Sequence, residues 1–371
     1  MHKNVIDIPI IAITGSSGKT TVKEMVSSIL QLCWKTFKSF ENGNDVWFTS
    51  QYVKQIDSSY QAIVLEYGMT HAGNITEHCR LIQPNMGIIT NVGIAHVGNF
   101  EDQKYGVISA KSELIKGMKP DGILFLNEDD TISKLLDRGG FKGEVITIGI
   151  QNNADYKAKE IHYNDNGMDF QVEIDGINSP FYIPIFGYHN VYNALFAIAV
   201  SHRFGFSIED IRLGLGTYYK TFGRLTVYRL KNEITIINDT FNAKPDAMKV
   251  AIDVLSNIGK GTKIAVLGCM FDLGTYTVHA HKEIGHYAAS RKVHYLYTVG
   301  KEAKIIGEAA LESGLLDENV KHFDSLDQLH QTLIGKIEPN TAVLIKGYCG
   351  IENSIKLKMT DTAMFLKNYF E

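Results

Sequence analysis

The sequence has little that would tie the chain to a disulfide scaffold or a structural metal site. It has only four cysteines (Cys33, Cys79, Cys269 and Cys349), and no two of them form a CxxC pair. This scattered spacing suits a reducing compartment. It argues against both a disulfide framework and a structural zinc site.

Long runs of one charge and long apolar runs are also missing. The 37 Lys and Arg residues nearly balance the 41 Asp and Glu residues, so the formal net charge is only -4. A nucleic-acid partner or a membrane surface therefore has no electrostatic support. No segment approaches the ~20 apolar residues that span a bilayer, and the apolar stretch at the N-terminus is too short for a signal peptide. We expect a soluble, cytoplasmic protein that acts on small molecules, as a monomer or a weak homo-oligomer.

What the sequence does contain is a regular alternation of short β-branched apolar runs with helical patterns, which is typical of a parallel sheet covered by helices. Strands are expected at 10–13, 62–68, 86–92, 122–127 and 145–150, then antiparallel hairpins over 156–186 and helices near 188–204 and 207–219. A second block offers strands at 233–239, 263–269, 295–300 and 342–347. The sequence therefore predicts an α/β fold with two domains, residues 1–222 and 223–371. The first has a P-loop-type, mostly parallel sheet with an antiparallel hairpin insertion, and the second is a smaller Rossmann-like domain.

The segment IAITGSSGKTT (11–21) reads as a buried strand, a glycine loop and the start of a helix. In such a loop the backbone N–H groups surround phosphate oxygens, and the helix end adds partial positive charge. The predicted cradle for ATP consists of Gly15, Ser16, Ser17 and Gly18. Lys19 would reach the β- and γ-phosphates and Thr20 would offer its hydroxyl to Mg²⁺, with Thr21 as a second candidate. The alternative is a glycine turn that only packs a strand on a helix.

Polar residues at the ends of two further strands point to the same edge of the sheet. Glu66 closes an apolar run in AIVLEYG, and Asn91 and His96 follow the next strand in ITNVGIAH. Open α/β sheets bind ligands at the carboxyl ends of their strands. A lone Glu or His is more often a cap or a satisfied polar group, but three together favour a Mg²⁺ and phosphate site.

These motifs carry a family resemblance. TGSSGKTT, EYGM, ITNVGIAH, SAKSEL and LNEDD, in this order, resemble the central ATPase domain of the Mur ligase family. The resemblance continues through FGYHNVYNAL, GRL, INDTFNAKPDAM, VLGCMFDLG and LIKG, and so covers nearly the whole chain. It implies a central ATP-binding domain over 1–222 and a C-terminal ligase domain over 223–371. It also implies an ATP- and Mg²⁺-dependent enzyme that activates a substrate carboxylate as an acyl phosphate and joins it to an amine, with release of ADP and phosphate.

The resemblance also implies roles for residues of the first domain. Lys19 and Thr20 would hold the ATP phosphates and one Mg²⁺, and Glu66 and His96 would serve the metal ions. Lys111, in SAKSEL, matches a lysine that is often carbamylated by CO₂ in this family, which gives an anionic group near a second Mg²⁺. Without that chemistry Lys111 would read as an ordinary solvated helix lysine.

Further roles concern the base of the nucleotide and the second domain. Asn190 and Asn193 fall where the family recognises the base, although helix capping is the alternative for this motif. Arg224 matches an arginine that reaches the γ-phosphate, and Asp239 and Asn242 match a motif that closes on nucleotide and substrate. These assignments imply that the second domain swings onto the first about their junction.

Several features depart from the family pattern. Peptidoglycan ligases carry a domain ahead of the phosphate loop that holds the UDP-sugar, whereas fewer than a dozen residues precede the first strand here. Asn74 and Cys269 stand where acidic residues are usual, and Asn238 stands where a second Asp is common. Lys346-Gly347-Tyr348-Cys349 replaces a KGSR-like ending. We therefore expect a ligase of a specialised pathway rather than of main-line wall synthesis.

Two other functions stay open at this point. In the first, the chain is a peptidoglycan precursor ligase whose UDP-peptide is held elsewhere. In the second, it is a nucleotide switch that hydrolyses ATP without ligation. The switch would need neither a carbamylated Lys111 nor a domain-closing Arg224.

Overall fold

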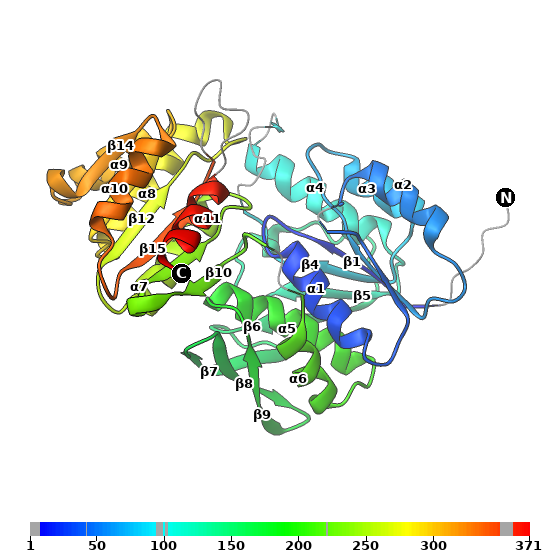
Figure 1. The fold of residues 1–371 in the computed structure, drawn as a ribbon. Helices are drawn as coiled ribbons and strands as arrows, with labels where there is room; N and C mark the ends of the chain where they lie inside the picture. Colours follow the sequence, from blue (N-terminus) through cyan, green and yellow to red (C-terminus); the bar gives the residue numbers. More distant parts are fainter. Residues whose placement is uncertain (1–7, 42, 94–98, 101–102, 220–221, 349–358) are drawn as a thin grey trace. The chain divides into compact units, whose positions relative to one another are not determined.

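The computed structural model describes residues 8–41, 43–93, 99–100, 103–219, 222–348 and 359–371 (Figure 1). The chain divides into two compact units, one formed by residues 1–184 with 188–221 and the other by residues 185–187 with 222–371. Each unit is built on its own sheet. The predicted α/β class, with a large mostly parallel sheet followed by a smaller sheet, is confirmed.

The first unit is built on a nine-stranded sheet in the order β2-β3-β1-β4-β5-β6-β7-β8-β9 (Figure 1). Its strands are β1 (Ile10–Thr14), β2 (Thr36–Lys38), β3 (Ala62–Glu66), β4 (Met86–Ile89), β5 (Ile123–Asn127), β6 (Glu144–Gly149), β7 (Tyr156–Tyr163), β8 (Met168–Ile174) and β9 (Ile177–Ile183). All pairs from β2 to β7 are parallel, and β7-β8-β9 is antiparallel. The predicted hairpins therefore extend the sheet rather than forming a separate layer.

Within the described residues, six α-helices accompany this sheet: α1 (Lys19–Leu30), α2 (Val46–Gln55), α3 (Asn74–Leu81), α4 (Gln103–Gly117), α5 (Tyr188–Arg203) and α6 (Ile208–Thr217). Helix α1 packs against α5 and α6, and α3 packs against α2 and α4 (Figure 1). Every residue of β1 and β3 is buried. This explains their unbroken apolar runs, since a parallel strand covered on both faces has no solvent side to alternate with.

A buried histidine joins α3 to this core. The ring of His78 stacks on Tyr67 with 4.5 Å between centroids. Its Nδ1 lies 2.7 Å from the hydroxyl of Thr49, and its Nε2 lies 3.1 Å from the carbonyl oxygen of Gly68. Burial lowers the pKa of His78 to about 4 because the charged ring would lose its hydration.

This lowered pKa predicts a stability that falls in acid. The unfolded chain protonates His78 near the usual pKa of ~6.5, whereas the folded protein does so only near pH 4. The full stability is present above pH 6.5 and declines as the pH falls towards 4, by about 2 kcal/mol at pH 5. Urea unfolding at pH 7.5 and pH 5 measures this loss. His78→Gln, which cannot titrate, should lose about 2 kcal/mol less over the same interval, and an equal loss in both proteins would contradict the prediction.

The second unit has a six-stranded sheet in the order β10-β11-β15-β12-β13-β14. Its elements are β10 (Thr226–Arg229), β11 (Thr235–Asn238), α7 (Pro245–Ile258), β12 (Lys263–Leu267), α8 (Thr277–Ser290), β13 (Tyr295–Val299), α9 (Lys304–Glu312), β14 (Val320–Phe323), α10 (Leu326–Lys336), β15 (Ala342–Lys346) and α11 (Met359–Phe370). Among the strands that the structure describes in this sheet, only β10 runs antiparallel to its neighbour. Apolar side chains of α10 and α11 pack on β11, β12, β13 and β15. None of the helices in the described ranges of either unit is long and apolar enough to cross a membrane.

Candidate active site

The glycine loop between β1 and α1 has a backbone that only glycine accommodates at two positions. Gly18 has φ 83°, and a Cβ there would lie 2.4 Å from Oδ1 of Asn193. A Cβ on Gly15 would lie 1.8 Å from Oγ1 of Thr90. Gly15 has φ 150°, so the backbone angle and the close approach both require glycine at each of the two positions.

The end of β4 fixes the shape of this loop. The backbone N–H groups of Ser16 and Ser17 donate to Oδ1 of Asn91 at 3.1 and 3.0 Å, and Nδ2 of Asn91 donates to Oγ of Ser17 at 2.8 Å. The hydroxyl of Thr90 donates to the carbonyl oxygen of Ser17 at 2.6 Å. The sequence suggested Asn91 as part of a magnesium and phosphate site. In the structure, the side chain of Asn91 shapes the glycine loop by hydrogen bonds to the backbone of Ser16 and Ser17.

The first turn of α1 brings the predicted phosphate and metal residues to the end of β3. Nζ of Lys19 donates to the carbonyl oxygen of Gly15 at 2.8 Å. The hydroxyl of Thr20 donates to Oε2 of Glu66 at 2.9 Å. Glu66 is only 2% exposed. Thr21 is also buried on α1. A hydroxyl and a carboxylate held together next to a phosphate loop are oxygen ligands of the kind that Mg²⁺ prefers.

Lys111 lies on α4 and is 2% exposed, which overturns the alternative of a solvated lysine. Burial lowers the pKa of its ammonium well below the usual range, and the positive charge of Lys19 lowers it further. The carboxylate of Asp130 opposes this shift. Asp130 is itself fixed by the N–H of Val92 at 2.6 Å and the hydroxyl of Ser133 at 2.5 Å. These surroundings favour the neutral amine over the ammonium, and the neutral amine is the form that reacts with CO₂.

The two asparagines predicted to bind the base lie together in the first turns of α5. Both are buried, and Nδ2 of Asn193 donates to Oδ1 of Asn190 at 2.9 Å. Asn193 also lies against Gly18 of the phosphate loop. The structure therefore brings Asn190 and Asn193 to the loop. His96 lies outside the described residues, and the described part of the chain has no group of three or more His, Cys, Asp or Glu side chains that could hold a metal ion.

A polar cluster in the second unit contains Asp239 and Asn242. Nζ of Lys346 lies 2.6 Å from Oδ2 of Asp239 and donates to the carbonyl oxygen of Asn242 at 2.8 Å. The N–H of Leu225 donates to Oδ1 of Asp239 at 3.0 Å, and the hydroxyl of Tyr348 donates to Oδ1 of Asn242 at 3.0 Å. The cluster thus joins the ends of β11 and β15 to the segment before β10.

Arg224 belongs to that same segment. Its guanidinium lies over the ring of Phe241, 4.0 Å from the centroid. Arginine stacks on aromatic faces in this way because its guanidinium is planar and delocalised. The sequence-predicted residues Arg224, Asp239 and Asn242 are therefore gathered at one edge of the smaller sheet.

The residues that depart from the family pattern have structural partners of their own. Oδ1 of Asn74 accepts from the N–H groups of Thr70 and His71 at 3.0 Å each, and so closes the turn before α3. Sγ of Cys269 lies 3.4 Å from Glu302, and burial raises the pKa of this thiol to about 12. Both positions are therefore neutral at physiological pH, where the family pattern has a charge.

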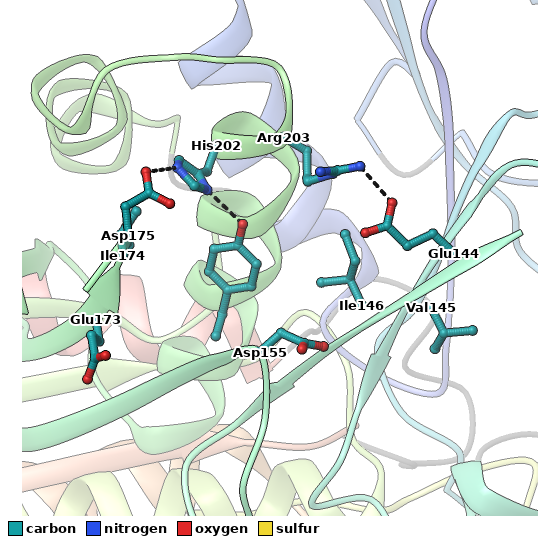
Figure 2. Close-up of a pocket in the computed structure, with 10 residues that line it drawn as sticks. Glu144, Val145, Ile146, Asp155, Glu173, Ile174, Asp175, His202 and Arg203 are labelled. Atoms are coloured by element: carbon teal, nitrogen blue, oxygen red, sulfur yellow. Dashed lines mark hydrogen bonds and ion pairs between the residues drawn. The ribbon is translucent and has the colours of Figure 1, made fainter. Parts of the chain in front are cut away.

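A separate cavity of about 390 Å³ lies between β6, β7, β8 and the end of α5 (Figure 2). In it, His202 lies 2.7 Å from the hydroxyl of Tyr156 and 3.2 Å from Asp175, and Arg203 pairs with Glu144 at 2.6 Å. Of these residues, Glu144 and Tyr156 lie at the start of β6 and β7, whereas the phosphate loop follows the end of β1. Because β1 and β6 belong to the parallel part of one sheet, the cavity and the loop lie at opposite edges of it.

Sequence reasoning missed one residue of the site, Asn44. Its Nδ2 donates to Oε1 of Glu66 at 2.8 Å. Asn44 lies in a connection between β2 and α2 that shows neither periodicity nor a spacing motif. Its only signal was the density of small and polar residues in FENGND, which indicates a turn.

Residues 13–201 match the Mur ligase middle domain, and residues 223–349 match the Mur ligase, glutamate ligase domain. Two similar proteins are named UDP-N-acetylmuramoyl-tripeptide–D-alanyl-D-alanine ligase. The one from Bacillus subtilis is 32% identical over 92% of this chain and 74% of its own length. The one from Haemophilus influenzae is 30% identical over 96% and 76%.

Solved structures give the same similarity. MurF from Acinetobacter baumannii superposes with a TM-score of 0.86 at 28% identity, over 98% of this chain and 77% of that protein. MurF ligase from Thermotoga maritima, solved in complex with ADP, superposes with a TM-score of 0.84 at 21% identity, over 98% and 80%. The second match supports the fold alone.

Proposed function

Because this chain belongs to the Mur ligase family, we propose that it joins the carboxylate of a UDP-N-acetylmuramoyl-tripeptide to the amine of D-alanyl-D-alanine. As a member of that family it is an ATP-dependent carbon–nitrogen ligase. The observation that carries the proposal is the glycine loop whose Thr20 hydroxyl lies 2.9 Å from the buried carboxylate of Glu66. The substrates are those named for the relatives. The relatives give no support to a specialised pathway, which the sequence had favoured.

The proposed reaction has two steps. A carboxylate is a poor electrophile, so a carboxylate oxygen first attacks the γ-phosphorus of ATP, and ADP leaves with the electrons of the broken bond. The amine then attacks the carbonyl carbon of the acyl phosphate, loses a proton, and expels inorganic phosphate. Little covalent chemistry falls to the protein, whose task is to position the reactants and stabilise charge on the phosphate oxygens.

We assign roles in the first unit from the positions of the described residues. The Lys19 ammonium would neutralise the phosphates, and Thr20 and Glu66 would hold Mg²⁺, which supplies charge neutralisation when bound. Asn190 and Asn193 would contact the nucleotide base. A carbamate on Lys111 would add a carboxylate-like ligand, and the low pKa of its ammonium supports this assignment.

In the second unit we propose that Arg224, Asp239 and Asn242 serve nucleotide and substrate. The buried ammonium of Lys346 joins Asp239 and Asn242, so it would keep this group rigid. Preorganisation of this kind removes the free-energy cost of ordering side chains during the reaction.

The test measures phosphate release by the purified protein with ATP and Mg²⁺. Release of ADP and phosphate should require both UDP-N-acetylmuramoyl-tripeptide and D-alanyl-D-alanine, and omission of either should abolish it. With ¹⁸O in the substrate carboxylate, one labelled oxygen should appear in the phosphate, because the acyl phosphate passes that oxygen to the leaving group. Phosphate release that no carboxylate or amine stimulates would refute the proposal and favour an ATPase switch.

A further inference from the structure

The carboxylate of Glu66 has a second donor in addition to Thr20. Nδ2 of Asn44 donates to Oε1 at 2.8 Å, while the hydroxyl of Thr20 donates to Oε2 at 2.9 Å. Each oxygen of the carboxylate therefore accepts a hydrogen bond from a side chain of the described residues. Two donors on opposite oxygens fix the plane of the carboxylate, which a single donor would leave able to rotate.

The connection that carries Asn44 is held from inside the unit. The ammonium of Lys23, which is fully buried, donates to the carbonyl oxygen of Ser39 at 2.9 Å and to that of Glu41. The hydroxyl of Tyr52 donates to the carbonyl oxygen of Gly43 at 2.9 Å. Burying a lysine costs free energy unless its donors are satisfied. The carbonyl oxygens of residues 39 and 41 are thus tied to one buried cation.

Gly68, two residues after Glu66, makes room for Asn44. The N–H of Gly68 donates to the carbonyl oxygen of Asn44 at 2.7 Å. A Cβ on Gly68 would lie 2.6 Å from Oδ1 of Asn44. Directly after Asn44, Asp45 caps α2 by accepting from the N–H of Phe48 at 2.9 Å. The backbone of Asn44 is therefore held on both sides, and its amide is aimed at Glu66.

We propose that Asn44 is a positioning residue that orients the carboxylate of Glu66 towards the magnesium ion of bound Mg²⁺·ATP. This inference rests on the proposed function, which assigns Glu66 to Mg²⁺. Partners that orient a metal-binding carboxylate usually affect metal affinity by ~10- to 100-fold. Asn44 would then act on the metal through Glu66 without contacting the nucleotide.

The experiment measures binding of a fluorescent ATP analogue to the purified protein, first with EDTA and then over a Mg²⁺ titration. Asn44→Ala should leave binding in EDTA unchanged and raise the Mg²⁺ concentration at half-effect about 10-fold. Asn85→Ala is the matched control. Asn85 is another half-buried asparagine, but its amide bonds Ile10 and Ile8 at the opposite end of β1. Asn85→Ala should lose about as much stability as Asn44→Ala, with no change in its Mg²⁺ dependence.

Glu66→Gln separates failure of this inference from failure of the proposed function. The role of Glu66 holds if Mg²⁺ strengthens binding of the analogue to the wild type and Glu66→Gln weakens that effect. In that case, an Asn44→Ala protein whose Mg²⁺ concentration at half-effect lies within twofold of the wild type overturns the role of Asn44 alone. If Mg²⁺ has no effect on the wild type, both the role of Glu66 and that of Asn44 fall. Thermal unfolding accompanies each variant, and Asn44→Ser replaces Asn44→Ala in the same measurement if the alanine variant does not fold.

Discussion

Lys19→Met is expected to lower kcat/KM for ATP by about 1,000-fold, or roughly 4 kcal/mol of transition-state stabilisation. The loop between Gly15 and Gly18 ends at Lys19, whose ammonium lies 2.8 Å from the carbonyl oxygen of Gly15. Methionine keeps much of the length and apolar character of the side chain but removes the charge. The developing negative charge on the transferred phosphoryl group would then lose the positive charge of Lys19.

Two comparisons make this prediction specific. Lys19→Arg should recover little activity, because a planar guanidinium does not replace a compact ammonium in a tight loop. Lys116→Met is the control on α4. Lys116 pairs with Asp137 at 2.6 Å, and both side chains are at least half exposed, so its loss should be nearly silent. A Lys19→Met protein that kept more than a tenth of wild-type kcat/KM would contradict the assignment.

The parts of the fold that the sequence predicted are those with strong local signals. The fully buried strands β1 and β3 read as apolar runs, and the glycine loop follows β1 directly. The strands that sequence analysis missed are β2, β10 and β14, of three or four residues each. Such strands are too short to show a period, and all three lie at the edges of their sheets. Pairing with a neighbour, rather than local pattern, defines them.

The residues of the candidate site also differ in how far local sequence predicts them. Lys19, Thr20 and Glu66 were found because they sit at fixed places in a strand–loop–helix pattern and at a strand end. Asn44 was missed because its role comes from a contact with Glu66, 22 positions further along the chain. The state of Lys111 depends on burial, which its place in a helical pattern does not reveal. Contacts between segments that are distant in the sequence therefore determine the role of Asn44 and the state of Lys111, and the local sequence does not reveal them.

Lys111→Met is the second variant with a large expected effect, and it should strongly reduce ligation and remove the dependence on CO₂. The neighbours of Lys111 favour its neutral form, since burial and the charge of Lys19 both lower the pKa of its ammonium. A neutral amine can attack CO₂ to form a carbamate, and its anionic product would gain from the nearby cation. We expect a loss of ~100-fold or more in kcat, of the size seen when a charged group that stabilises a transition state is removed.

Wild-type activity should therefore fall when CO₂ is removed from the buffer and should return on addition of bicarbonate. It should also fall with decreasing pH, because protonation of the Lys111 amine prevents carbamate formation. Carbon-13 NMR with labelled bicarbonate should show a carbamate signal that is missing in Lys111→Met. Lys111 contrasts here with Lys116 of the same helix, whose side chain is half exposed and pairs with Asp137 at 2.6 Å. Lys116→Met should accordingly keep both the signal and the CO₂ dependence. Unchanged turnover in Lys111→Met would instead favour the ATPase switch, because simple hydrolysis needs no carbamate at this position.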